Sequence, residues 1–488
     1  MSVVASILLS MVDAQFRNHG LGPVLDSFTL SASQEKVAVL PKGMSALVYG
    51  VPASGKTTAL KALVLHKLRS GFKPEEILVI TANRDSATKL RDELALEFQD
   101  ATPGPMARTL ASFAFSILRE RALSLGFKAP ELITGSEQDQ IISELIEEFL
   151  RTELPEDWPK QLRRQVLELR GFRTELRDLI TVCLEHEIEP SQLEKLGTEQ
   201  GQPHWVAMSG FFAGYLKRLR EPANENRHDP STLLTVVVRE LQENATPKVV
   251  SDLKLVIVDD AQELTPAAAT LLRAVVSKGA DLVLFGDPDA TTMGFRAANA
   301  GGMKELAALT GKPFETINLA QSVGSRHPDL TAVLAKTASR ISTERVGTHR
   351  SALGATDQTV GNRVEGRVFD LETSELAWLA HRLRELHLQQ GIAWSEMVVV
   401  ARSRDVLEKW AAALASESVP TVIHGSQTSF KDEFSTGNLL RLAKFCIEPV
   451  ELNRDVILEL LRNPYTGLDS LAIRRIRRRL RQLELDAG

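Results

Sequence analysis

The chain has 488 residues, which is enough for about three domains of ordinary size. Its residues are 43% hydrophobic and 25% charged, as in globular proteins, and its net charge of −5 provides no overall positive field. A nucleic-acid site must therefore be a local groove. The two cysteines, Cys183 and Cys446, exclude a structural metal site built from four cysteines and fit a reducing compartment. We interpret both as small core residues.

No run of about 18 apolar residues occurs, so we predict no membrane span and no membrane partner. Residues 1–11 are apolar but lack a basic start and an evident cleavage site, so we interpret them as a helix and not as a signal peptide. Residues 30–37 predict a second helix with a serine cap. These features predict a cytoplasmic protein.

The next pattern, Gly50–Thr57, reads G-x-x-x-x-G-K-T. Residues 45–49 before it are apolar, as in a buried strand, and residues 58–68 after it lack Gly and Pro, as in a helix. This context predicts a phosphate-binding loop whose backbone N–H groups face the phosphates. We expect Lys56 to contact the β- and γ-phosphates and Thr57 to bind Mg²⁺ through its hydroxyl. The alternative is a chance match in a turn.

Strand and helix patterns alternate around a long helical stretch. Residues 77–81 predict a strand and residues 83–98 the helix after it, while residues 253–258 and 280–285 predict two further strands. From Ser112 to about Arg227, helical periodicity dominates without a convincing strand. We therefore predict an α/β core with a parallel sheet, interrupted by an inserted helical domain.

A second α/β unit is predicted after a polar loop at residues 341–366. Its predicted strands are residues 367–370, 397–402 and 420–423, and its predicted helices are residues 375–390 and 406–416. The tail is helical and includes the arginine-rich run 474–481. We interpret this run as the solvated face of a helix, with DNA phosphate binding as the alternative.

An acidic pair, Asp259 and Asp260, ends the strand pattern at residues 253–258. The carboxyl end of a buried strand is where the Mg²⁺ of a bound nucleotide needs negative charge. We predict that Asp259 holds the metal and that Asp260 orients or deprotonates the attacking water. The alternative is a pair that only caps the next helix. Gly286–Asp289, after the next strand, is expected beside the same crevice, although it is also a favourable turn sequence.

In order and spacing, these motifs resemble those of the UvrD/Rep-like superfamily 1 DNA helicases, from Gln34 to about Ile447. The resemblance implies that Gln34 reads adenine and that Asp259–Gln262 is the D-E-x-Q box, with Gln262 in the catalytic set beside Lys56 and Asp260. The other segments that match family motifs are Thr81–Arg84, Thr109–Phe113, Asp229–Leu234, Gly286–Arg296 and Leu319–Arg326.

The resemblance also implies two sets of binding residues. The expected nucleotide contacts are Gln34, Gly50, Val51, Pro52, Ala53, Ser54, Gly55, Lys56, Thr57 and Thr58. The expected DNA contacts are Thr81, Asn83, Arg84, Phe295 and Arg296. For the last two, a core aromatic and a solvated charge are the alternative interpretation.

The implied fold is an α/β P-loop NTPase with two RecA-like parallel-sheet domains and inserted helical subdomains, the second motor domain being incomplete. The predicted division is residues 1–112 and 228–318 (first motor domain), 113–227 (helical insertion), 319–450 (partial second motor domain) and 451–488 (start of a second insertion). The implied cofactors are ATP and Mg²⁺. The implied activity is ATP-driven movement on single-stranded or tailed DNA, usually 3′ to 5′, in repair or recombination.

Several positions depart from the family pattern. Asp260 replaces the catalytic glutamate, and Ala290 replaces the glutamine of the third motif. Val323 replaces an aromatic residue, and Gly324 replaces the arginine beside it, for which Arg326 substitutes if the register shifts by two. We expect the last family motifs, including the second arginine finger, to be absent.

The D-D-A-Q box and the arginine-rich tail resemble the less typical motor subunit of actinobacterial AdnAB helicase–nucleases. That resemblance implies a second helicase–nuclease subunit as a partner. One alternative is a weak or inactive ATP- and DNA-binding subunit. Another is a P-loop ATPase acting on a different polymer.

Overall fold

The structure is a computed structural model. It describes residues 30–97, 105–133, 135–153, 158–221, 227–294, 297–320, 328–342, 348–353, 364–423 and 470–486, together with a few isolated residues. The chain divides into two compact units, residues 1–365 and 366–488, and each is described by itself. The helix predicted at residues 1–11 lies outside the described residues.

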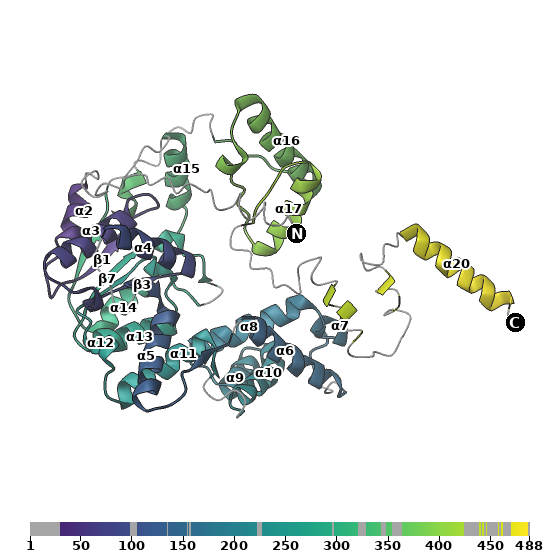
Figure 1. Cartoon of the computed structure of the whole chain (residues 1–488), viewed down its shortest axis with the longest axis horizontal. Coiled ribbons are helices and arrows are strands. Elements are labelled where there is room, and N and C mark those ends of the chain that lie inside the picture. The colour runs from purple at the N-terminus through teal and green to yellow at the C-terminus, as the bar shows by residue number, and fades with distance from the viewer. Residues whose placement is uncertain are drawn as a thin grey trace, which may run out of the picture. The chain divides into compact units, whose positions relative to one another are not determined.

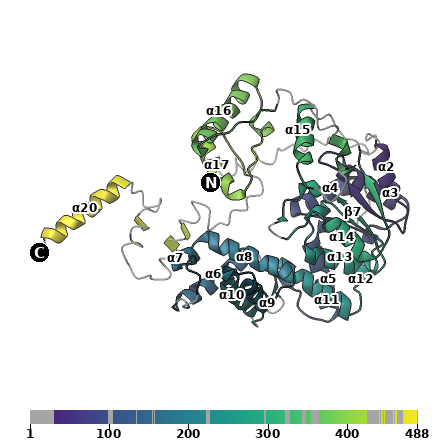
Figure 2. The same cartoon turned by 180° about the vertical axis from the view of Figure 1, so that it is seen from behind.

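A six-stranded parallel sheet forms the centre of the first unit, in the order β3-β2-β6-β7-β1-β8 (Figures 1 and 2). The chain is thus an α/β protein built on a parallel sheet, as predicted. The strands are β1 (Ser45–Tyr49), β2 (Ile77–Thr81), β3 (Ala107–Thr109), β6 (Leu255–Val258), β7 (Asp281–Gly286) and β8 (Phe314–Asn318).

Helices cover both faces of this sheet (Figures 1 and 2). Those on one face are α2 (Ala32–Ala38), α3 (Lys56–Arg69) and α4 (Arg84–Glu97). Those on the other face are α5 (Leu110–Ser124), α11 (Pro230–Glu243), α13 (Pro266–Val276) and α14 (Gly302–Thr310). Short helical turns connect them: η2 (Pro74–Glu76), α12 (Lys248–Ser251), η4 (Ala261–Glu263) and η5 (Pro288–Ala290).

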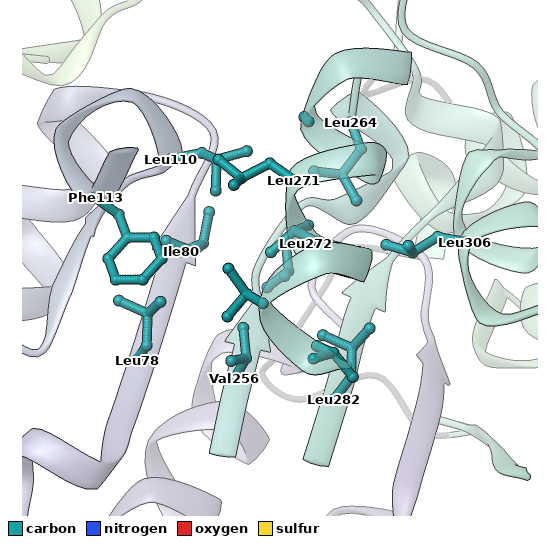
Figure 3. Close-up of a cluster of buried hydrophobic side chains, with 14 of the residues drawn as sticks. Leu78, Ile80, Leu110, Phe113, Val256, Leu264, Leu271, Leu272, Leu282 and Leu306 are labelled. Carbon is teal, nitrogen blue, oxygen red and sulfur yellow. The ribbon is translucent and has the colours of Figure 1, made fainter. Parts of the chain in front are cut away.

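The central strands are apolar throughout because both of their faces are buried. Successive side chains alternate between the two hydrophobic clusters: Leu78 and Ile80 of β2 face α5, whereas Ile77 and Val79 face α3 and α4. Figure 3 shows the first cluster, where Phe113 of α5 lies against the β2 side chains. This packing fixes the carboxyl ends of the strands along one edge.

A helical cluster with its own hydrophobic core is formed by the chain between α5 and α11. Its helices are α6 (Gly135–Leu150), α7 (Arg164–Leu167), α8 (Arg170–Glu185), α9 (Pro190–Glu199) and α10 (Pro203–Leu219). The expectation of no strand here was wrong in one detail, because β4 (Glu131–Leu132) and β5 (Arg227–His228) form a two-residue parallel pair. The four-domain division given above stays a prediction.

After β8, the first unit contains α15 (Pro328–Ser339) and the turn η7 (Thr348–Leu353). The second unit contains α16 (Glu372–Gln390), η8 (Trp394–Glu396), α17 (Arg404–Ser416) and α20 (Ser470–Asp486).

The strands predicted at residues 367–370, 397–402 and 420–423 are not formed in the described part of this second unit. Val368, Val400 and Val422 are 98%, 84% and 85% exposed, and the segments that carry them pair with no other strand among the described residues. Their apolar pattern favours a strand, but a strand also needs a partner that completes its hydrogen bonds.

Candidate active site

The predicted phosphate loop lies between β1 and α3, as its flanking sequence indicated. The Gly50 N–H donates to the Gly286 carbonyl at 3.2 Å, which ties the loop to the neighbouring strand β7. Gly55 precedes α3 with φ of 80°, a left-handed conformation that favours glycine. Ala53 also has a positive φ, 55°. The loop therefore turns sharply and directs the start of α3 toward the carboxyl edge of the sheet.

The interior of this loop fits a phosphate group. Ser54 is 1% exposed, and its Oγ has no hydrogen-bond partner among the described residues. A Cβ atom added at Gly50 would lie 2.2 Å from this Oγ and 3.3 Å from Cβ of Leu319, so only glycine fits there. The Lys56 Nζ folds back and donates to the carbonyl of Gly50 at 2.7 Å. A phosphate would meet an ammonium and an unsatisfied hydroxyl at this loop.

The predicted metal ligands, Thr57 and Asp259, are 202 residues apart in sequence and adjacent in space, with Thr57 Oγ1 donating to Asp259 Oδ2 at 3.3 Å. Burial removes water from the Asp259 carboxylate and, together with the negative charge of Asp260, raises its pKa to about 6. A hydroxyl and a carboxylate are oxygen ligands that suit Mg²⁺. The residues present therefore fit the predicted cation.

The Asp260 backbone has φ of 50°, a left-handed conformation that is uncommon without glycine. The Gln262 Nε2 donates to Asp260 Oδ1 at 3.3 Å, while its Oε1 accepts from the Asp287 N–H at 3.0 Å. Gln262 is 4% exposed, so its side chain is held between the ends of β6 and β7. This contact places the predicted base and Gln262 in one hydrogen-bonded group.

Gln34, predicted to read adenine, lies in α2 and is 1% exposed. Its Oε1 accepts from the Ser31 N–H at 2.9 Å, and its Nε2 donates to the Gly55 carbonyl at 3.2 Å. The side chain therefore joins the capped start of α2 to the phosphate loop. Adenine recognition by Gln34 stays a prediction.

Three of the predicted DNA contacts lie where β2 ends, on the edge that also carries Asp259. Thr81 is buried, and its Oγ1 donates to the Asn83 carbonyl at 3.1 Å. Asn83 caps α4, since its Oδ1 accepts from the Ser86 N–H at 2.8 Å. Asn83 and Arg84 are exposed. Thr81 is therefore a supporting residue, and the exposed pair is open to a ligand.

Other predicted positions lie outside the described residues: Phe295, Arg296, Val323, Gly324 and Arg326. Ala290 is described, and it ends the turn η5 after β7. Two clefts, of about 470 and 350 Å³, lie away from the phosphate loop, along α11 and α13, and they share Gln242, Thr270 and Arg273.

Sequence reasoning missed a buried ionic cluster beside the crevice. Asp289 of η5 accepts from Arg350 Nε at 2.6 Å and from Arg350 Nη2 at 2.7 Å, and His349 Nε2 lies 3.0 Å from the same carboxylate. Burial would raise the pKa of Asp289, but the hydrogen bonds from Arg350 and His349 lower it below its ordinary value. The partners are about 60 residues apart, and no motif connected them.

No helix in the described part of the chain has the length and apolar character needed to cross a membrane. Residues 30–309, more than half of the chain, match the UvrD/REP helicase N-terminal domain.

Similar curated proteins include the ATP-dependent DNA helicase srs2 of Schizosaccharomyces pombe, with 22% identity over 82% of this chain and 44% of that protein. A probable DNA helicase II homolog of Mycoplasma capricolum is 19% identical over 80% of this chain and 51% of its own length. The mitochondrial ATP-dependent DNA helicase HMI1 of Saccharomyces cerevisiae is 23% identical over 40% of this chain and 28% of that protein. The chain spans about half the length of the first two relatives.

Proposed function

This chain belongs to the UvrD/REP helicase family, and from that premise we propose that it is a motor that couples ATP hydrolysis to movement on single-stranded DNA. The observation that carries the proposal is the meeting of Lys56, Thr57 and Asp259 at the carboxyl ends of β1 and β6. A lysine, a hydroxyl and a carboxylate in this arrangement are the groups that nucleotide hydrolysis requires.

Each residue has a separate role in this proposal. The phosphate-loop amides and Lys56 bind the β- and γ-phosphates and balance the charge that develops on them during transfer. Thr57 and Asp259 hold Mg²⁺, which neutralises phosphate charge when it is bound. Asp260 orients the attacking water and takes its proton, and Gln262 fixes the Asp260 carboxylate.

We further propose that DNA is gripped at the same edge of the sheet by Asn83 and Arg84, with Thr81 supporting them. Phe295 and Arg296 are proposed as additional contacts, through stacking and charge. Opening and closing of the nucleotide crevice would then move the strand, in the 3′ to 5′ direction and in repair or recombination.

The direct test is movement on single-stranded oligonucleotides that carry a fluorophore at either the 3′ or the 5′ end. Movement from 3′ to 5′ predicts an ATP-dependent signal when the motor reaches a 5′ label. The Lys56→Ala variant should abolish the signal, because it removes the phosphate-binding charge. Lys61→Ala is the matched control, since Lys61 lies five residues later in the same helix, α3, and pairs with Glu93. A signal that persists in Lys56→Ala would refute the site.

A second function is favoured by Asp260 and Ala290, which stand where the related helicases carry a longer acid and a glutamine. In that case the chain binds ATP and DNA but hydrolyses ATP weakly. It would be an AdnA-like subunit of a cytoplasmic helicase–nuclease that has a second motor subunit. If the chain binds nucleotide without hydrolysing it, and a partner motor restores hydrolysis, the second function holds and the first does not.

A further inference from the structure

The segment from α15 to η7 contacts the phosphate loop and the turn that follows β7. Val51 of the phosphate loop is 1% exposed and packs with Ala335 and Ala338 of α15 and with Leu353 of η7. Asp289, in the turn after β7, pairs with residues of the same η7. One segment of the chain therefore touches both the phosphate loop and the turn after β7, which leads by hydrogen bonds to Asp260.

The ionic contact is buried and doubly hydrogen-bonded. The side chains of Asp289, His349 and Arg350 are 8%, 0% and 17% exposed. The guanidinium of Arg350 uses two nitrogens on the two oxygens of Asp289, and it also donates to the Ile341 carbonyl at 3.0 Å. Such bidentate pairs hold a fixed geometry, and the loss of one partner leaves a buried charge uncompensated.

Asp287, Asp289 and His349 bring their ligand atoms within 4.8 Å of one another, which is close enough to hold a cation. However, Arg350 already occupies both oxygens of Asp289 with a positive charge. A metal ion would have to displace this guanidinium. We therefore interpret the cluster as an ion-pair clamp and not as a metal site.

The clamp continues as a chain of hydrogen bonds into the candidate active site. The Asp289 N–H donates to Asp287 Oδ1 at 3.0 Å, and the Asp287 N–H donates to Gln262 Oε1 at 3.0 Å. Gln262 then donates to Asp260, the proposed base, at 3.3 Å. Each of the four links from Arg350 to Asp260 is thus a hydrogen bond between named groups, and Asp287, in the middle of the route, is 2% exposed.

We infer that Arg350 is a positioning residue for the proposed hydrolysis: through Asp289, Asp287 and Gln262 it fixes Asp260 and carries the state of the α15–η7 segment to the crevice. The inference rests on the proposed function. Ala290, the residue after Asp289, has no polar side-chain group, and the described ion pairs of this turn with η7 are made by Asp289. These contacts form a continuous network of hydrogen bonds, which is one physical route by which such coupling travels.

The kinetic test compares Arg350→Met, Arg350→Lys and Asp289→Asn in DNA-stimulated ATP turnover and in binding of a fluorescent ADP analogue. Arg350→Met should lower kcat at least tenfold and change the ADP Kd less than threefold, because the phosphate contacts stay intact. Arg350→Lys should recover part of the loss. Arg350→Met and Asp289→Asn combined should be no worse than either alone, since both act through one route.

Arg121→Met is the matched control, because Arg121 forms a 2.8 Å ion pair with Glu240, 28% and 18% exposed, away from the crevice. It should leave kcat within twofold, although it removes a comparable ion pair. An unchanged kcat in Arg350→Met, or an equal loss in Arg121→Met, would overturn the inference.

Hydrogen exchange provides a readout that does not depend on turnover. Adding ATP with Mg²⁺ should slow exchange at residues 50–57 and at residues 348–353. In Asp289→Asn, protection should persist at residues 50–57 and disappear at residues 348–353. If the native chain shows this coupling but no hydrolysis, the proposed function fails, whereas the coupling between the α15–η7 segment and the phosphate loop stands. If residues 348–353 do not respond to ATP in the native chain, the positioning role fails.

Discussion

Asp259 shows that a buried carboxylate in the candidate active site has a cost to stability. Its pKa rises from 3.8 to about 6 on folding, so the folded protein binds this proton more tightly than the unfolded chain does. The stability that the protonated form provides is fully present below about pH 4 and is lost as the pH rises through about 6. At pH 7 the ionised carboxylate therefore destabilises the nucleotide-free protein.

Asp259→Asn should raise the free energy of unfolding at pH 7 by about 1–3 kcal/mol, because the amide stays neutral. The same variant should lose Mg²⁺-dependent turnover. Urea unfolding without nucleotide, at pH 7 and at pH 4, measures the first effect, and the native and variant curves should converge at pH 4. A variant that is less stable than the native chain at pH 7 would contradict this account of the carboxylate.

Gly50 tests the shape of the phosphate loop. Gly50→Ala places a methyl group 2.2 Å from Ser54 Oγ and 3.1 Å from Ser54 Cβ, so the loop must shift. We expect nucleotide affinity to fall at least tenfold, measured by titration calorimetry with ADP. Gly210→Ala is the control, because Gly210 is in α10 and a Cβ added there has nothing within 4 Å. The ADP affinity of this variant should match that of the native chain.

Site residues that belong to a recognisable motif could be predicted from the sequence. Residues outside any motif, which the fold brings together, could not. Lys56, Thr57 and Asp259 are recognisable because a glycine loop and a strand-ending acid have fixed spacing to their own strands. The pairing of Asp289 with His349 and Arg350 joins two turns that carry no spacing rule. A buried charge can be recognised from the sequence when it lies in an otherwise apolar stretch, but neither of these two turns is apolar.

At the scale of elements, burial decided which strands could be predicted. β1 and β2 coincide with their predicted ranges because all five residues of each are buried and apolar patterns mark them. β3 and β8 were missed, since β3 has three residues and β8 is a partly exposed edge strand. Residues 367–370, 397–402 and 420–423 of the second unit are rich in β-branched residues but form no strand, so such residues alone do not make one.

The docking of α5 on the sheet gives a prediction about stability. Phe113 is 1% exposed and lies against β2 (Figure 3), so Phe113→Ala should lower the free energy of unfolding by about 3–5 kcal/mol. Phe127→Ala, at a site that is 65% exposed, should change it by less than about 1 kcal/mol. Urea unfolding of both variants measures the difference, and equal losses would show that α5 does not dock through Phe113.

At the scale of the whole molecule, a negatively charged chain is proposed to act on a polyanion. The net charge of −5 means that affinity for DNA must come from a local arrangement such as the edge carrying Asn83 and Arg84. The sheet brings this edge and the phosphate loop together, because β2 and β6 are neighbours and β1 and β7 are neighbours. We therefore propose that the nucleotide and the single-stranded DNA bind along the same edge of the sheet.

The rate of ATP hydrolysis by the purified chain, with and without single-stranded DNA and beside Lys56→Ala, tests the central claim most directly. We expect DNA to stimulate turnover at least severalfold and Lys56→Ala to abolish it, while Lys61→Ala keeps the native rate. Turnover that ignores DNA, or that survives Lys56→Ala, would contradict a DNA-driven motor whose phosphate site is Gly50–Thr57.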